Sequence, residues 1–143
     1  MSWTRFRYHL ILGTRRRAPL ITPEIEEILY GILKALIVEL GGAVVEINGV
    51  EDHVHVVFAL PPRLAFSDFV RDLKCISNRR LNAIARLPEP FGWQQEYGAT
   101  TAFPDQLAHL ILYVRNQKQH HANDTALDAW EHLPRERDHK TPT

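Results

Sequence analysis

Apolar and polar residues alternate in two stretches of the chain, 4–12 and 53–60, and this period of two predicts β-strands. Because successive side chains of a strand point to opposite faces, the even-numbered residues of both stretches form apolar faces. These residues are Phe6, Tyr8, Leu10, Leu12, Val54, Val56, Phe58 and Leu60. The opposite faces carry His9 in the first stretch and His53 and His55 in the second. We therefore expect a sheet with one face on the core and histidines on the other.

A period near 3.6 residues predicts helices over residues 23–40, about 67–86 and about 104–121. The first is expected to begin at Thr22-Pro23, an N-cap followed by proline at the first helical position. Ser67 is expected to cap the second helix. Pro104 is expected to open the third.

Two further strands are predicted at residues 43–48 and 97–103, and Asn48-Gly49 is a common start of a hairpin turn. The resulting order, β-α-β-β-α-β-α, predicts an α+β fold of the ferredoxin-like (RRM-like) type. In this fold two helices cover one face of a four-stranded antiparallel sheet, and the third helix follows at the C-terminal end. The first and third strands are then neighbours, so His9 is expected near His53 and His55.

The length of 143 residues indicates one domain, expected at 1–123, followed by a polar and partly disordered tail at 124–143 with a short helix near 126–132. Lys+Arg and Asp+Glu both number 17, so any nucleic-acid surface has to be a local patch. A single cysteine, Cys75, excludes an internal disulfide. The N-terminus lacks the long apolar region of a signal peptide, and we expect a cytoplasmic protein.

Two imidazoles on one strand face, His53 and His55, can grip a metal ion, although such a pair is also found as solvated or core histidines. On the third predicted helix, Tyr113 and Gln117 lie one turn apart. If that helix face lies over the histidines, the Gln117 carbonyl oxygen offers a third ligand and the Tyr113 phenol stands nearby. The alternative is that both are packing residues.

Three other histidines compete with Gln117 as metal ligands, and a site with three imidazoles would suggest zinc. They are His109, His120 and His121.

The combination resembles the small, single-tyrosine transposases of the HUH superfamily, of the bacterial and archaeal insertion-sequence type, to which REP-associated tyrosine transposases are close relatives. The resemblance covers about residues 7–121. It rests on Tyr8-His9-Leu10, Glu46-Ile47-Asn48-Gly49-Val50, Asp52-His53-Val54-His55, Leu73-Lys74, Trp93-Gln94-Gln95-Glu96-Tyr97-Gly98-Ala99 and Tyr113-Val114-Arg115-Asn116-Gln117.

The resemblance implies that His53, His55 and Gln117 bind a divalent ion, Mg²⁺ or Mn²⁺, and that Tyr113 is the nucleophile. It implies cleavage and rejoining of single-stranded DNA, at hairpin-containing element ends, through a 5′-phosphotyrosine intermediate. It also implies a homodimer in which the tyrosine helix of one chain can complete the site of the other. The expected accessory residues are His9, Asp52 and Asn116.

Phosphate contacts are expected from positive side chains in a loop and on the second predicted helix. The candidates are Arg15, Arg16, Arg17, Arg71, Lys74, Arg79 and Arg80, each of which can equally be a solvated surface residue. Trp93 and Tyr97 can stack on bases or belong to the core.

Two rival functions remain open from the sequence. A cupin-type metal enzyme also carries an HxH motif on a strand, but its fold is nearly all strands. A domesticated or non-catalytic relative that binds chromosomal palindromes would share the ferredoxin-like fold. Subterminal palindromes flanking the gene would indicate an insertion sequence rather than a domesticated relative, and a phosphotyrosine trap with oligonucleotides derived from the element ends would test for catalysis.

Overall fold

The computed structural model describes residues 2–136 and contains one four-stranded antiparallel sheet. Its strands are β1 (Arg7–Thr14), β2 (Ala43–Val50), β3 (His53–Ala59) and β4 (Trp93–Thr101). Its helices are α1 (Pro23–Glu39), α2 (Phe66–Ile84), α3 (Leu107–Arg115) and α4 (Gln117–Ala122), with short 3-10 turns η1 (Arg15–Arg17) and η2 (Asp128–Trp130). The strand order β2-β3-β1-β4 is the ferredoxin-like order, so the predicted fold is confirmed and the cupin alternative is wrong.

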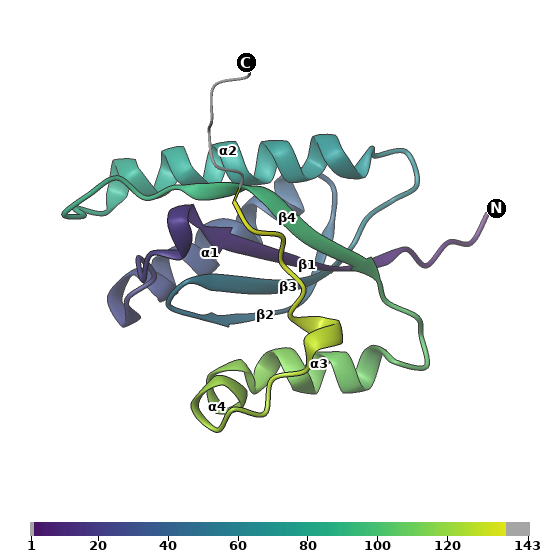
Figure 1. The fold of residues 1–143 in the computed structure, drawn as a ribbon. Coiled ribbons are helices and arrows are strands. Elements are labelled where there is room, and N and C mark those ends of the chain that lie inside the picture. Colours follow the sequence, from purple (N-terminus) through teal and green to yellow (C-terminus); the bar gives the residue numbers. More distant parts are fainter. Residues whose placement is uncertain (1, 137–143) are drawn as a thin grey trace, which may run out of the picture.

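The two faces of the sheet have different neighbours (Figure 1). The even-numbered residues of β1 and β3, among them Leu10, Val56 and Phe58, pack with α1 and α2 in the main core. On the other face, which we call the open face, Val57 packs with Leu110 and other residues of α3. Figure 1 shows α2 and α3 on opposite sides of the sheet. The predicted division into an apolar face and a histidine face is confirmed, because His9, His53 and His55 alternate with the core residues.

The predicted turn at Asn48-Gly49 is wrong, because β2 continues through both residues. Asn48 pairs with His55 and Gly49 with Val54, and the chain reverses only at Glu51-Asp52. A side chain at Gly49 would overlap the carbonyl oxygen of His53. The glycine therefore permits a close approach between strands.

Several other predicted boundaries shift. The second helix begins at Phe66 after Ala65, so Ser67 is not its N-cap. The third predicted helix is interrupted at Asn116, whose backbone (φ −99°, ψ 21°) leaves the helical region, so that α4 starts anew at Gln117. Strand β4 starts at Trp93 rather than Tyr97. Trp93 is buried in the main core, which argues against a role in stacking on bases.

Residues 123–136, which we call the C-terminal segment, cross the open face of the sheet (Figure 1). Pro134 accepts a hydrogen bond from Gln94 Nε2 at 2.9 Å, and Glu136 accepts one from the Arg16 backbone N–H at 2.6 Å. The short helix predicted near 126–132 is found as η2. The division between a domain and a tail stays a prediction, and residues 137–143 lie outside the described part of the chain.

Within residues 2–136, no helix is long and apolar enough to cross a membrane.

Candidate metal and tyrosine site

The histidine pair lies on β3, in the buried middle of the open face. His53 and His55 are both buried, and the neighbouring strand β1 brings His9 alongside, as predicted. His9 Nε2 lies 2.7 Å from His55 Nδ1, so one of these two nitrogens carries the shared proton. The second nitrogen of His55, Nε2, is left facing the site.

Burial keeps His9 and His55 neutral. Burial, together with the nearby His55 ring, lowers the pKa of His9 to about 3. Burial also lowers the pKa of His55, although the carboxylate of Glu131 partly opposes this effect. Because only the neutral imidazole offers a lone pair, both shifts favour metal binding at His55 near neutral pH.

Asp52 orients His53 from the turn between β2 and β3. His53 Nδ1 lies 2.7 Å from Asp52 Oδ1, and Arg17 Nη2 lies 3.4 Å from the same oxygen. Partial burial would raise the pKa of Asp52, but the hydrogen bond from His53 and the charge of Arg17 outweigh it and lower the pKa. An ionised Asp52 at this distance requires a proton on Nδ1 of His53. The other nitrogen, Nε2, therefore faces the site.

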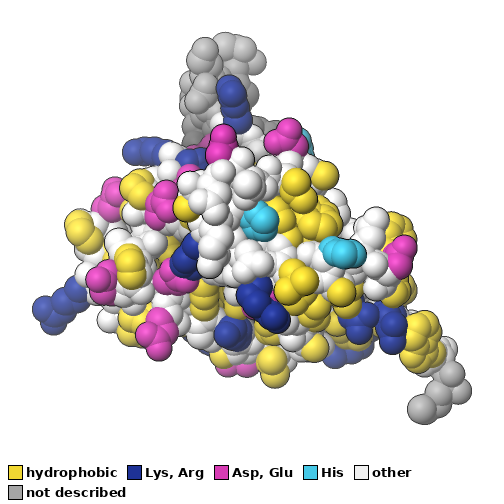
Figure 2. All heavy atoms as spheres, turned by 90° about the horizontal axis from the view of Figure 1, so that it is seen from below, with side chains coloured by type: hydrophobic (Ala, Val, Ile, Leu, Met, Phe, Trp, Pro, Cys, Tyr) yellow, Lys and Arg dark blue, Asp and Glu magenta, His cyan; other side chains and the backbone are white. Residues whose placement is uncertain are grey.

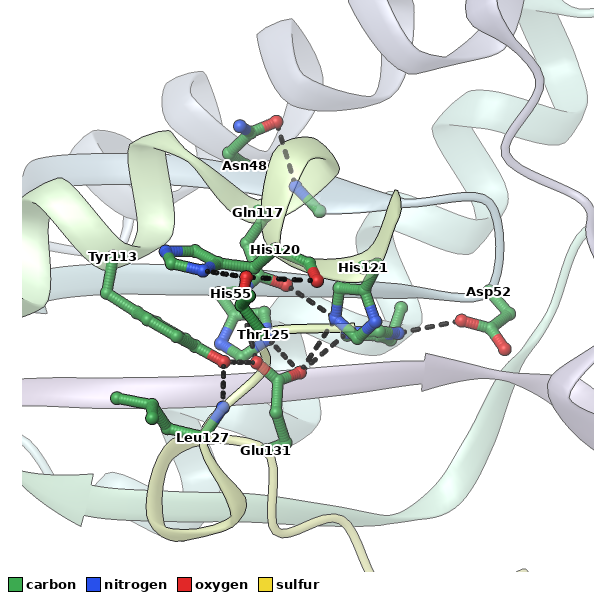
Figure 3. Close-up of polar contacts among 12 residues, drawn as sticks. Asn48, Asp52, His55, Tyr113, Gln117, His120, His121, Thr125, Leu127 and Glu131 are labelled. Atoms are coloured by element: carbon green, nitrogen blue, oxygen red, sulfur yellow. Dashed lines mark hydrogen bonds and ion pairs between the residues drawn. The ribbon is translucent and has the colours of Figure 1, made fainter. Parts of the chain in front are cut away.

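Tyr113 projects from α3 onto the open face, where its phenol is buried and directed towards the histidines (Figure 3). Its ring centroid lies 6.2 Å from that of His55 and 4.6 Å from that of His120. Tyr113 also packs with Leu110 and other apolar residues. The break at Asn116 matters here, because it starts α4 with Gln117 fully buried beside the same site.

Glu131 was missed by the sequence analysis. It comes from the C-terminal segment, and its carboxylate lies at the centre of the site (Figure 3). Glu131 Oε1 lies 3.1 Å from His53 Nε2 and 2.9 Å from His55 Nε2. Glu131 Oε2 accepts hydrogen bonds from the hydroxyl of Tyr113 and, at 3.0 Å, from Gln117 Nε2. No pattern in the sequence marks this residue, which is one charged residue in a polar stretch.

The contacts around Glu131 shift the pKa values of Glu131 and of Tyr113. Partial burial would raise the pKa of Glu131, but hydrogen bonds to His53, His55 and Tyr113 outweigh it and hold the pKa far below its ordinary range. Burial and the hydrogen bond to this carboxylate raise the pKa of Tyr113 to about 12. Tyr113 is therefore a protonated donor at neutral pH.

The donor set fits a divalent metal ion. One ligand atom each from His53, His55 and Glu131 lie within 4.8 Å of one another, the only such group among the described residues. Gln117 is adjacent, with Oε1 3.1 Å from His121 Nε2. Imidazole nitrogens suit Zn²⁺, Cu²⁺, Fe²⁺ and Ni²⁺, and a carboxylate oxygen also suits Mg²⁺ and Mn²⁺. The structure thus supplies a site that can hold a metal, with a carboxylate that the prediction lacked.

The rival histidines lie elsewhere or at the edge. His109 is exposed on α3, and His120 stacks on Tyr113 and contacts Thr125 Oγ1 at 2.9 Å. His121 Nε2 lies 3.1 Å from Glu131 Oε1, close to the cluster. Asn116, predicted as an accessory residue, is exposed and forms the helix break.

The predicted phosphate-binding residues are spread over several surfaces. Arg15, Arg71 and Lys74 line a cavity of about 590 Å³ between α2 and β4. Others are engaged within the chain, since Arg80 pairs with Glu39 and Arg17 with Asp52. Figure 2 shows cations and acids interspersed with hydrophobic side chains on the face seen from below. The role of these residues in DNA binding stays a prediction.

Comparison with known proteins gives consistent matches. The family model described as "Transposase IS200 like" matches residues 2–117. The ISDra2 transposase TnpA of Deinococcus radiodurans is 29% identical over 118 residues, which cover 79% of this chain and 84% of that protein. The crystal structure of a candidate transposase from Deinococcus radiodurans has a TM-score of 0.67 and 28% identity, covering 81% of this chain and 93% of the other.

A second solved structure extends the likeness of fold. The REP-associated tyrosine transposase bound to a REP hairpin has a TM-score of 0.62 and 14% identity, covering 93% of this chain and 82% of that chain. The matches and the histidine-bearing sheet together define the class of this protein, which is that of the transposases. Within that class, the chain belongs to the IS200-like family, and the resemblance inferred from the sequence is confirmed.

Proposed function

We propose that this transposase cleaves and rejoins single-stranded DNA through a covalent bond between Tyr113 and a 5′-phosphate. The observation that carries the proposal is the meeting, within one chain, of a buried phenol with the facing nitrogens of His53 and His55. A tyrosine beside a metal-binding cluster suits nucleophilic attack on a phosphodiester. The phosphate bond is conserved in the adduct, so rejoining needs no nucleotide cofactor.

The metal in this proposal is Mg²⁺ or Mn²⁺, held by His53, His55 and Gln117. When bound, such an ion supplies positive charge that stabilises the negative charge developing on a phosphate under attack. Asp52 holds His53 by its Nδ1–H, and His9 contacts the outer nitrogen of His55. These two residues orient the histidine ligands.

Tyr113 performs the covalent step. Its oxygen bonds to phosphorus, the bond from phosphorus to the 3′ oxygen breaks, and the departing strand keeps a 3′-hydroxyl. Attack by a 3′-hydroxyl on the phosphotyrosine reverses these changes and joins the strands. The phenol has to lose its proton, and with a pKa raised to about 12 it needs help. The acidity of Glu131 makes that carboxylate a weak base, so we assign no general base.

The proposed substrate is a single-stranded element end that contains a hairpin, bound in the cytoplasm. A solved relative of the same fold is bound to a REP hairpin. Arg15, Arg71 and Lys74 around the cavity between α2 and β4 are the first candidates for phosphate contacts. A homodimer with sites completed in trans stays a prediction. In this structure, Tyr113 and the histidine pair come from the same chain.

The test is a covalent trap with 5′- and 3′-labelled oligonucleotides derived from the ends of the element, single- and double-stranded, in the presence of Mn²⁺. We expect a protein–DNA adduct with single strands and no adduct for Tyr113→Phe, whose DNA binding should be nearly unchanged. An adduct that persists in Tyr113→Phe would refute the nucleophile assignment. Hairpin binding by the wild type without any adduct would favour the non-catalytic alternative.

A further inference from the structure

We infer that Glu131 is a resident ligand of the metal, so that the C-terminal segment completes a site of two histidines and one carboxylate. The inference rests on the proposed metal at His53 and His55 and adds a ligand to it. A 2-His-1-carboxylate set occupies one face of an octahedral ion and leaves other positions open for substrate. Here one position would be available to Gln117 and others to a DNA phosphate.

The distances fit ligands that share one ion. Neighbouring ligands of an octahedral ion at about 2.1 Å from each donor lie about 3 Å apart. Glu131 Oε1 lies 2.9 Å from His55 Nε2 and 3.1 Å from His53 Nε2. The second carboxylate oxygen is held by Gln117 Nε2 at 3.0 Å, which directs Oε1 towards the two histidines.

The orientation of His53 also suits a shared ion. Asp52 Oδ1 lies 2.7 Å from Nδ1 of His53, so the other ring nitrogen, Nε2, is directed at Glu131 Oε1, 3.1 Å away. A carboxylate that orients a metal-binding histidine, as Asp52 does, is the common outer-shell arrangement.

The C-terminal segment is seated by contacts that do not involve the carboxylate. Its Leu127 N–H donates to the Tyr113 hydroxyl at 2.9 Å, and the ring of Trp130 packs edge-on to Tyr113 with centroids 5.0 Å apart. Further along, the backbone passes so close to Gly98 of β4 that a side chain there would overlap the carbonyl oxygen of His132. The sheet surface thus accommodates this segment, and Glu131 is placed over the histidines.

Metal affinity of the full-length protein without DNA tests the inference. Titration calorimetry and the EPR signal of free Mn²⁺ would be measured for wild type, Glu131→Gln and Asp128→Asn. Glu131→Gln keeps the shape of the side chain and removes its charge, and we expect Mn²⁺ binding to weaken about tenfold or more. Asp128→Asn makes the same change in charge on an exposed residue of the same segment and should bind as the wild type does.

A second variant changes no ligand. Gly98→Ala places a methyl group where the segment passes, so it should displace Glu131 and weaken Mn²⁺ binding several-fold, with circular dichroism confirming the fold. Wild-type affinity in Glu131→Gln would overturn the inference, as would a wild type that binds no Mn²⁺. Faster DNA cleavage by Glu131→Gln at unchanged Mn²⁺ affinity would also overturn it and identify the carboxylate as a plug. Mn²⁺ binding that depends on Glu131, with no tyrosine adduct, would refute only the proposed function.

Discussion

The same strands form both faces of the sheet, but the side chains buried on the two faces differ in chemistry. On the face covered by α1 and α2, residues such as Val56 and Phe58 are buried among apolar side chains. On the open face, His55 and Gln117 are buried as completely, but among polar groups that contact one another. The first kind of burial stabilises the fold through the hydrophobic effect, and the second costs desolvation that only specific partners offset.

This difference separates stability from function along a single strand. In β3, successive residues point alternately into the core and towards the open face. Substitution of a core residue is therefore expected to change stability, and substitution of an adjacent histidine to change metal binding. Loss of side-chain volume is therefore expected to matter most on the core face, and loss of a polar partner at the histidine site of the open face.

The largest effect is expected on the core face. Phe58 is fully buried and contacts the rings of Phe66 and Phe69, with centroids 6.2 and 5.2 Å away. Phe58→Ala should lower the free energy of unfolding by about 3–5 kcal/mol. Urea denaturation in the absence of metal measures this change. The folded fraction should still bind Mn²⁺ as the wild type does, whereas His55→Ala should lose that binding. Equal losses of affinity in both variants would contradict the separation of the faces.

A smaller effect is expected from acid on the open face. The folded pKa of His9 is about 3, well below its value of about 6.5 in an unfolded chain. Between these values the unfolded chain binds a proton that the folded chain does not, so stability falls as the pH drops. From pH 6.5 to 5 this amounts to about 1–2 kcal/mol from His9. His55, whose pKa is also lowered by burial, adds to this loss of stability. Burial would lower the pKa of His53, but hydrogen bonds to Asp52 and Glu131 raise it, so His53 opposes the loss.

The contribution of His9 to the pH dependence of stability is obtained by comparing a His9 variant with the wild type. His9→Gln keeps a polar side chain beside His55 and removes the titrating ring. Its free energy of unfolding, measured by urea denaturation at pH 6.5 and pH 5, should depend less on pH than that of the wild type. A slope equal to that of the wild type would show that His9 is not the buried neutral group described here.

The core face could be predicted from the sequence because its pattern is local. Alternation in β3 and the 3.6-residue period of the helices follow from backbone geometry, and they led to the observed order of elements. At Asn48-Gly49 the local sequence signal gave a wrong prediction, because strand pairing determines the conformation there. Asn48-Gly49 is a strong turn signal, but pairing with His55 and Val54 keeps both residues in β2.

The open face was predictable only in part. The histidine pair lies on one regular strand, so the sequence placed those two side chains together. Tyr113 and Gln117 were expected near them only if their helix covered the histidines, and the break at Asn116 between them was not predicted. Glu131 lies on an irregular segment without periodicity, and its position depends on contacts with distant residues such as Gly98 and Tyr113. No local pattern records such contacts.

A still smaller change concerns the acidity of Tyr113. Burial and the Glu131 carboxylate raise its pKa to about 12. Glu131→Gln removes the negative charge and leaves the burial, so the pKa should fall by about one unit, towards its ordinary value. Absorbance at 295 nm measures tyrosine ionisation, and the difference from the same variant with Tyr113→Phe isolates this phenol. An unchanged pKa would mean that the carboxylate does not contact Tyr113 in solution.

The smallest effect is expected from one methyl group placed on either side of the sheet. Gly31 lies in α1, and a Cβ added there meets no heavy atom within 4 Å. Gly31→Ala should therefore raise the free energy of unfolding by about 0.5–1 kcal/mol, because alanine loses less backbone entropy in a helix. Mn²⁺ affinity should not change, in contrast to Gly98→Ala, which makes the same chemical change under the C-terminal segment. If both variants bind Mn²⁺ equally well, the segment does not contribute to the site, and the open face consists of the sheet and α3–α4 alone.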